Sequence, residues 1–238
     1  MIKQKKQKRK KSNWKKYFFE FLSIFIAVIS AFALNNWNEN RRDNDAALKI
    51  LTEISNGLEK DLEDINGNIG GHKVGLEACA FWRKVILDQE INQDSLGIRY
   101  LRLTRDFFSA QNNSGYETLK SRGLELVRND SLRFDIISLY EYDYKSLKTM
   151  EEDYFEMQFQ ENYFKDINKY FAPNFEFDEH GEISKINMPL KINAEGKKIL
   201  LAYLWKIQLN RHFILRYYKD MERKIIDLNQ RIEQEINR

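Results

Sequence analysis

The fold is decided by the stretch Tyr17–Leu34, which reads YFFEFLSIFIAVISAFAL and contains one charge in 18 residues. As an α-helix it spans roughly 27 Å at 1.5 Å per residue, close to the ~30 Å core of a bilayer. Trp14 and Tyr17 flank one side of the run and Trp37 the other, and such aromatic rings favour the headgroup layer. The sequence therefore predicts a transmembrane helix over residues 17–37, with these three aromatic residues at the membrane interface.

The chain before this stretch is strongly basic. Residues 1–16 hold nine Lys or Arg and no acid, and positive charge marks the cytoplasmic flank of a span. We therefore expect a basic cytoplasmic tail over 1–16 and a single-pass protein of the bacterial inner membrane, with its domain over 43–238 in the periplasm. A nucleic-acid-binding tail is the other interpretation of these charges. The adjacent apolar run favours orientation of the span or attraction to anionic lipid.

A cleavable signal peptide is a second interpretation of the same N-terminus. A basic segment, an apolar segment and Ala31-Phe32-Ala33 match that pattern. The apolar run continues through Leu34, however, and Trp37 closes it in the manner of a membrane-interface residue. These two residues favour an uncleaved signal anchor. No cysteine directly follows the run, which excludes a lipoprotein.

Two features of the span invite a more specific interpretation. Glu20 is its only charge and lies one turn inside the basic end, so we expect an interfacial acid near Lys15 and Lys16; a proton or ion path is the alternative. Small residues recur every four positions and share one helix face, a spacing that permits close helix packing in lipid but is also common in spans generally. These possible span-packing residues are Ser23, Ala27 and Ala31.

Composition limits the functions that are expected of the exported part of the chain. The net charge of +3 combines opposite halves: without the nine basic residues of 1–16, 30 Lys/Arg face 36 Asp/Glu, so residues 17–238 carry −6. A mildly acidic domain is a poor candidate for binding nucleic acid. Cys79 is the only cysteine, so no intramolecular disulfide can form, and its apolar surroundings predict a small buried side chain.

Helix is the dominant prediction beyond the span, because the chain has ten glycines and only two prolines, Pro173 and Pro189. A first helix is expected to begin at Asp43 or Asp45, which are good N-cap types. Apolar residues follow every three or four positions until Gly70-Gly71 punctuates the pattern. Further helices are expected over residues 72–89, 94–108, 116–122, 129–171 and 194–237.

The turns between these helices complete the architecture. Gly123 is expected to end the short helix with a positive φ, and the proline-containing segment 173–192 predicts a small hairpin or loop insertion. The last helix carries a near-heptad apolar seam similar in length to that of the first. If the two seams pair antiparallel, the domain is all-α: a transmembrane helix followed by an elongated antiparallel helical bundle.

No catalytic signature accompanies this architecture. The three histidines are far apart, and the chain lacks a phosphate-binding glycine loop, a nucleophile elbow and zinc or di-metal spacings. We therefore expect no catalytic activity, no cofactor and no metal. An acidic cluster on the longest predicted helix is expected to be a solvated face, with a cation site or an acid–base pair as the alternative. Its members are Glu151, Glu152, Asp153 and Glu156.

Aromatic residues gather in the same region. Eleven of the 32 aromatics fall between Phe134 and Phe171, and their spacing covers more than one helix face. A wide core stripe is the expected role, and an aromatic pocket or partner surface is the alternative. The residues concerned are Tyr140, Tyr142, Tyr144, Tyr154, Phe155, Phe159, Tyr163 and Phe164.

The chain resembles a family of single-span membrane proteins of Gram-negative bacteria that is classified only as a domain of unknown function. In that family a Glu opens the span, fourteen residues follow, and an Asn-Asn-Trp-Asn-Glu box closes it; Glu20, Phe21–Leu34 and Asn35–Glu39 are similar. Tyr116, Leu119 and Gly123, with the run Leu124-Glu125-Leu126-Val127, resemble a second family segment. The chain departs from the family at Ala27, where Gly is common, and at Ala33, where Gln is common. The resemblance implies an uncleaved anchor and no particular activity.

These observations favour a membrane-anchored helical binding, scaffold or sensor protein. The alternative is an accessory subunit of a larger inner-membrane complex whose span packs against other transmembrane helices. A membrane-bound hydrolase, the third possibility, has almost no positive sign in the sequence. The expected partners are the lipid bilayer and either another protein or a second copy, bound through the span or the coiled-coil seam, and no nucleic acid.

Overall fold

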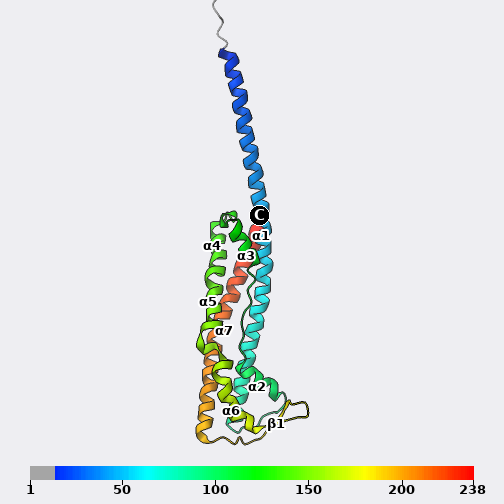
Figure 1. Ribbon diagram of the computed structural model, residues 1–238, viewed down its shortest axis with the longest axis vertical. Coiled ribbons are helices and arrows are strands. Elements are labelled where there is room, and N and C mark those ends of the chain that lie inside the picture. The colour runs from blue at the N-terminus through cyan, green and yellow to red at the C-terminus, as the bar shows by residue number, and fades with distance from the viewer. Residues whose placement is uncertain (1–13) are drawn as a thin grey trace, which may run out of the picture. The chain divides into compact units, whose positions relative to one another are not determined.

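The computed structural model describes residues 14–238, so residues 1–13 of the expected basic tail lie outside the described residues. The chain divides into two compact units, one ending at Leu48 and one covering Lys49–Arg238. Among the described residues the fold is all-α apart from one two-stranded hairpin (Figure 1). The predicted fold class is therefore confirmed.

Helix α1 covers Trp14–Ile86 without interruption. Within residues 14–238 it is the one helix long and apolar enough to cross a membrane. The predicted start of a new helix at Asp43 or Asp45 is wrong. No proline or glycine interrupts the polar stretch after the apolar run, and side chains there bond along the helix: Asn35 Nδ2 donates to Glu39 Oε1 at 2.9 Å.

The predicted break at Gly70-Gly71 is also wrong, and the helix expected over 72–89 is the end of α1. A Cβ at Gly71 would lie 2.3 Å from Cε1 of Phe107, whereas one at Gly70 would meet nothing within 4 Å. Gly71 therefore provides space for an aromatic ring rather than ending the helix. The chain leaves α1 after Ile86 through Asp88, which has a φ of 54°.

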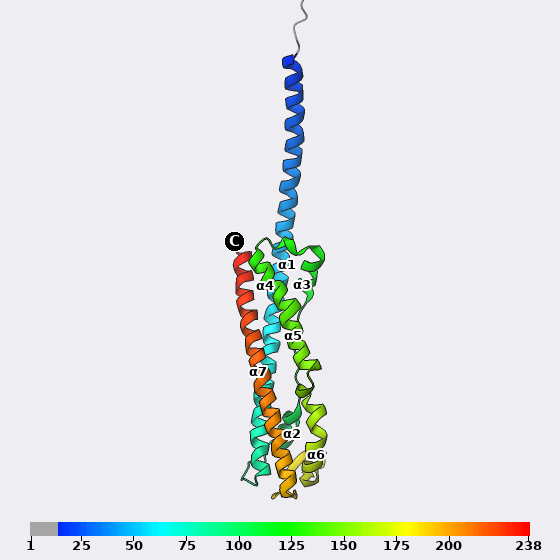
Figure 2. The ribbon, with the colours of Figure 1, turned by 90° about the vertical axis from the view of Figure 1, so that its left-hand side faces the viewer.

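Three long helical columns dominate the second unit (Figures 1 and 2). Helix α1 supplies one and helix α7 (Ala194–Ile236) another. The third consists of α4 (Asp130–Ser138), the π-helical turn η2 (Leu139–Asp143), α5 (Tyr144–Lys148), the π-helical turn η3 (Thr149–Asp153), the 3₁₀ turn η4 (Phe155–Met157), the π-helical turn η5 (Gln160–Phe164) and α6 (Lys165–Phe171).

The third column corrects the prediction of one continuous helix over 129–171. The start is as expected: the Asn129 side chain accepts from Leu132 N at 3.2 Å. The column is broken after η3, where Tyr154 is extended. The side-chain amide of Gln158 donates to the carbonyls of Glu151 and Glu152, at 2.7 and 3.2 Å, and so satisfies the end of η3.

Helices α1 and α7 are antiparallel neighbours, as the two seams predict. Ser55 Oγ donates to Asn229 Oδ1 at 2.7 Å, and His72 Nδ1 lies 3.1 Å from Arg211 Nη1. Partner numbers therefore fall along α7 as they rise along α1. The apolar residues between them are buried in one continuous core.

The segment 173–192 contains the expected hairpin. Strands β1 (Phe175–Phe177) and β2 (Ile183–Ile186) pair antiparallel, following the short 3₁₀ turn η6 (Ala172–Asn174). Helix α7 then follows, with Asn193 as its N-cap: the Asn193 side chain accepts from Gly196 N at 2.8 Å.

Two short helices lie between α1 and the third column. They are α2 (Leu96–Thr104), shorter than the predicted 94–108, and α3 (Ser114–Arg122). Gly123 ends α3 with a φ of 115°, which confirms the predicted positive φ; its ψ of 123° is extended rather than left-handed helical. The 3₁₀ turn η1 (Leu124–Leu126) follows.

An extended segment, residues 105–113, joins α2 to α3 and is here named the strap. It has no regular secondary structure, and it runs antiparallel to α1: Phe107 packs against Gly71, Asn112 against Gly57, and Gly115 of α3 against Ile54. The strap lies against α1 at the surface of the bundle, with its residues half-buried or exposed, and its backbone amides have no neighbouring strand to bond to.

Candidate functional site

The membrane-interface residues predicted from the sequence are all solvent-exposed along α1. Trp14, Tyr17 and Trp37 have 63–69% of their surface exposed. Glu20 Oε1 lies 3.9 Å from Lys16 Nζ, one turn earlier. Thirteen large apolar or aromatic side chains of this region are exposed: Trp14, Tyr17, Phe18, Phe19, Phe21, Ile24, Phe25, Ile26, Val28, Ile29, Phe32, Leu34 and Trp37.

The small residues of the predicted span are also exposed. Ser23 Oγ donates to the carbonyl oxygen of Glu20 at 2.8 Å, so this hydroxyl is used within its own helix. Ala27 and Ala31 present methyl groups and no large side chain. The face they share stays a prediction for helix packing.

Buried carboxylates form the polar interior of the second unit. Asp61 on α1 is 2% exposed; its Oδ1 accepts from Asn112 N of the strap at 2.7 Å, and its Oδ2 accepts from the Tyr144 hydroxyl at 2.6 Å. One turn further along α1, Asp64 Oδ2 accepts from Ala110 N at 3.0 Å. Burial raises the pKa of Asp61, while the bonds to Tyr144 and to the strap oppose the rise.

Glu151 completes this set from the third column, and it corrects a prediction. It was expected on a solvated acidic face, but it is 4% exposed. Its Oε2 accepts from both the backbone amide and the hydroxyl of Ser109 at 2.9 Å, and its Oε1 accepts from the Tyr218 hydroxyl. Burial raises the pKa of Glu151. Glu152 and Asp153 are exposed as expected.

Three carboxylates therefore accept the hydrogen bonds that a neighbouring strand would accept from the backbone amides of the strap. The amides of Ser109, Ala110 and Asn112 each donate to one of them. A buried amide without an acceptor costs about 1–3 kcal/mol. Asp61 and Glu151 thus each hold the strap with one oxygen and a tyrosine hydroxyl with the other. Sequence reasoning missed this role, because the acids and the amides that they accept from lie 42–51 residues apart.

A buried arginine holds the other end of the strap. Arg211 is fully buried; its Nη2 donates to the carbonyls of Leu103 and Arg105 at 3.1 and 3.0 Å, and its guanidinium lies 4.5 Å from the centre of the Phe159 ring. Burial lowers the pKa of Arg211 to about 10. The cation therefore caps the carbonyl end of α2, where the helix dipole is negative.

His72 is the neutral partner of this arginine. It is 3% exposed, and burial, with the nearby Arg211 charge, lowers its pKa to about 3. Its Nδ1 therefore accepts from the guanidinium. Cys79 is fully buried, as predicted, and burial raises the pKa of its thiol to about 11. Neither group is exposed for chemistry on a solvent-borne molecule.

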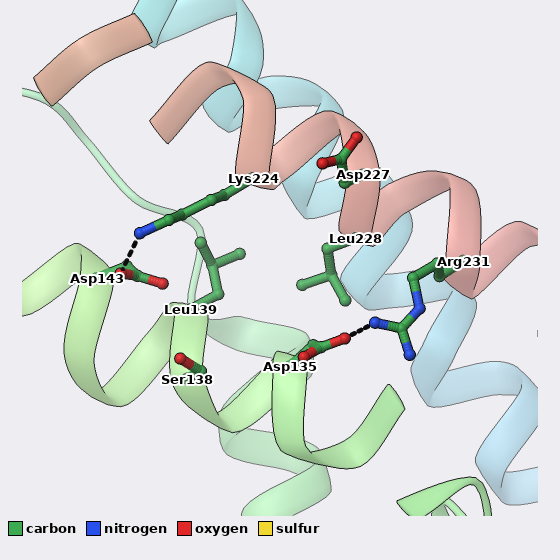
Figure 3. Close-up of a pocket in the computed structure, with 8 residues that line it drawn as sticks. All are labelled: Asp135, Ser138, Leu139, Asp143, Lys224, Asp227, Leu228 and Arg231. Atoms are coloured by element: carbon green, nitrogen blue, oxygen red, sulfur yellow. Dashed lines mark hydrogen bonds and ion pairs between the residues drawn. The ribbon is translucent and has the colours of Figure 1, made fainter. Parts of the chain in front are cut away.

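A surface cavity of about 280 Å³ lies between the third column and α7 (Figure 3). Two ion pairs cross it: Asp143 to Lys224 at 2.7 Å, and Asp135 to Arg231. The charges in the cavity thus pair across the helix interface. Among residues 14–238, no group of three or more His, Cys, Asp or Glu could hold a metal ion.

A second cavity, of about 260 Å³, lies beside α3. Glu141 lines it and accepts from Lys120 Nζ at 2.8 Å, from Lys145 Nζ, and from the Tyr116 hydroxyl at 2.9 Å, which together lower its pKa to about 2. The rings of Tyr116 and Tyr140, which also line this cavity, stack with 4.6 Å between their centres. Lys120 and Lys145 of this cavity are therefore already paired with Glu141, a carboxylate of the same chain.

The aromatic cluster divides between core and surface. Tyr140, Tyr144, Phe159 and Tyr163 are buried, as a core stripe predicts. Tyr142, Tyr154 and Phe155 are 41–71% exposed.

Comparisons with models of protein families, with curated proteins and with solved structures found no match to this chain. Residues 14–238 therefore offer two features: an exposed apolar helix, and a bundle in which Asp61, Glu151 and Arg211 bond to other groups of the same chain.

Proposed function

We propose that this protein is a membrane-anchored binding, scaffold or sensor protein of the bacterial inner membrane, with its N-terminus in the cytoplasm and its helical bundle in the periplasm. The observation that carries the proposal is the row of thirteen exposed large apolar or aromatic side chains on α1. Removing apolar surface from water stabilises by about 25 cal/mol per Å², and lipid supplies that environment along the whole row.

The orientation is supported by charge. The nine basic residues of 1–16 precede the apolar run, and such residues are retained on the cytoplasmic side. The resemblance of Glu20–Glu39 to single-span bacterial membrane proteins supports an uncleaved anchor in the same orientation.

The binding role is supported by how the bundle uses its polar groups. Asp61 and Glu151 accept from the strap and from tyrosine hydroxyls, Arg211 donates to carbonyls of α2 and the strap, and the two charged cavities contain internal ion pairs. Chemistry on a substrate requires groups that are free to change partners. The proposed activity is therefore the presentation of a surface rather than catalysis.

Carbonate extraction of membranes, followed by intact-mass measurement of the protein, tests the anchor. We expect the protein to stay in the membrane pellet with a mass that includes residues 1–33. A mass that corresponds to a start at Leu34 would identify a signal peptide and overturn the proposal.

The accessory-subunit alternative is favoured by the small residues of the span. Ala27→Leu would block close approach of a neighbouring helix, while Ile29→Leu, on another face, keeps its volume. If membrane subunits co-purify in detergent and Ala27→Leu alone releases them, the protein acts within a larger complex.

A further inference from the structure

One stretch of α7 has an unusual charge pattern. From Gly196 to Lys219 it contains no Asp or Glu but six Lys or Arg. Three of these have internal roles: Lys197 pairs with Asp88, Lys206 pairs with Glu156, and Arg211 is buried. The other three, Lys198, Arg216 and Lys219, are exposed, and no carboxylate within residues 14–238 lies at ion-pair distance from them.

The exposed cations share one side of α7 with exposed apolar residues. Trp205 is 62% exposed and Leu209 is 48% exposed, one helical turn apart. Intervals of three, four and seven residues place side chains on the same helix face. We name this surface the α7 face; it comprises Lys198, Ala202, Trp205, Leu209, His212, Arg216 and Lys219.

The α7 face has the composition of a protein interface. Trp is enriched among the residues that dominate binding energy, and such residues form an apolar centre with a polar rim. The other tryptophan of the second unit, Trp82, is fully buried, so exposure of Trp205 is not the rule here. Helix α7 lies on the outside of the bundle (Figure 2).

The rim determines which partner fits. Cations without a carboxylate partner, arranged around an apolar centre, attract carboxylates and repel other cations. A membrane surface fits less well, because only two large apolar side chains are exposed on this face, and interfacial helices bury a much wider apolar face.

We propose that the α7 face binds an acidic amphipathic segment of another protein. Apolar side chains of that segment would cover Trp205 and Leu209, and its carboxylates would pair with Lys198, Arg216 and Lys219. This inference rests on the proposed function and names the class of partner that would bind the bundle.

Trp205 itself provides the measurement. In full-length protein carrying Trp14→Phe and Trp37→Phe, held in phosphatidylcholine nanodiscs, it is the one exposed tryptophan. The probe is a synthetic helical peptide with Leu on one face and Glu on the other. We expect a blue shift of Trp205 emission and protection from acrylamide quenching, both weakened by salt.

Charge-reversal variants locate the contact. Arg216→Glu is expected to weaken binding of the peptide by roughly tenfold or more, which corresponds to about 1.4 kcal/mol. The matched control is Arg122→Glu, an exposed arginine on α3, which is expected to bind normally.

Four results would overturn the proposal: no response to the Glu peptide; an equal response to a peptide with Lys in place of Glu; a stronger response to phosphatidylglycerol vesicles, which would indicate a lipid surface; or a blue shift on concentrating the protein alone, which would indicate a second copy. None of these results affects carbonate extraction, so the anchor proposal stands or falls separately.

Discussion

At the scale of single residues, the interior of the bundle depends on buried acids that accept hydrogen bonds from backbone amides. Glu151 is the clearest case, because it connects Ser109 of the strap to Tyr218 of α7. Desolvation favours the protonated form of such a group, and the bonds from Ser109 and Tyr218 favour the charged form. The net result is a raised pKa, so stability depends on pH at this position.

Glu151→Gln and Glu151→Ala separate the charge from the hydrogen bonds. In the wild type, the folded state holds the Glu151 proton more tightly than the unfolded chain, so this contribution to stability is present at low pH and is lost as pH rises through the raised pKa. Gln has no proton to lose. We therefore expect the thermal midpoint of the Gln variant to gain on the wild type between about pH 5 and pH 8.

The Ala variant lacks any acceptor for the Ser109 amide, and we expect a loss of about 1–3 kcal/mol at either pH. Circular-dichroism melts of the three proteins make the comparison. An unchanged difference between the Gln variant and the wild type across the pH range would contradict the raised pKa.

The adjacent residues Gly70 and Gly71 provide a second test at this scale. Gly70→Ala meets open space, and removing a helical glycine stabilises by roughly 0.5–1 kcal/mol. Gly71→Ala would place a methyl group against the Phe107 ring, and overpacking costs about 1–3 kcal/mol. Opposite shifts of the urea midpoint are expected; shifts of the same sign would mean that the strap does not lie against α1.

At the scale of elements, local pattern determined what could be predicted. The apolar run, the seams of α1 and α7, the N-cap at Asn129 and the positive φ at Gly123 follow from neighbouring residues, and the structure contains all of them. The strap could not be predicted, because its stability depends on partners distant in sequence. The break after η3 was missed for the same reason: besides local bonds from Gln158, it depends on Asp106, which accepts from Phe159 N at 2.7 Å.

The pairing of α1 with α7 is tested by two adjacent residues of α7. Ile225 is 1% exposed and Ile226 is 37% exposed. Ile225→Asp loses a buried side chain, at about 2–5 kcal/mol, and also buries an acid; Leu58→Asp on α1 is expected to be comparably harmful. Ile226→Asp should change stability by only about 0.5 kcal/mol. Equal thermal midpoints for the Ile225 and Ile226 variants would show that the seam does not pack as described.

At the scale of the whole molecule, the two units differ in whether their apolar side chains are buried. The second unit buries its apolar residues in one core, whereas the first exposes them along α1. The sequence predicted this division, because residues 17–34 form an almost uninterrupted apolar run whereas the apolar residues of the later helices recur only every three or four positions. The proposed partner surface could not be predicted in the same way, because the α7 face becomes visible only when the internal partners of Lys197, Lys206 and Arg211 are known.

The central proposal is that the apolar run of α1 spans the membrane and separates a cytoplasmic tail from a bundle on the far side. Labelling of single cysteines with a membrane-impermeant maleimide in spheroplasts of a bacterial host tests it directly, in a Cys79→Ala background. Lys185→Cys, on the exposed hairpin, is predicted to label in intact spheroplasts, and Ser12→Cys only after lysis. Labelling of Lys185→Cys only after lysis would contradict the account.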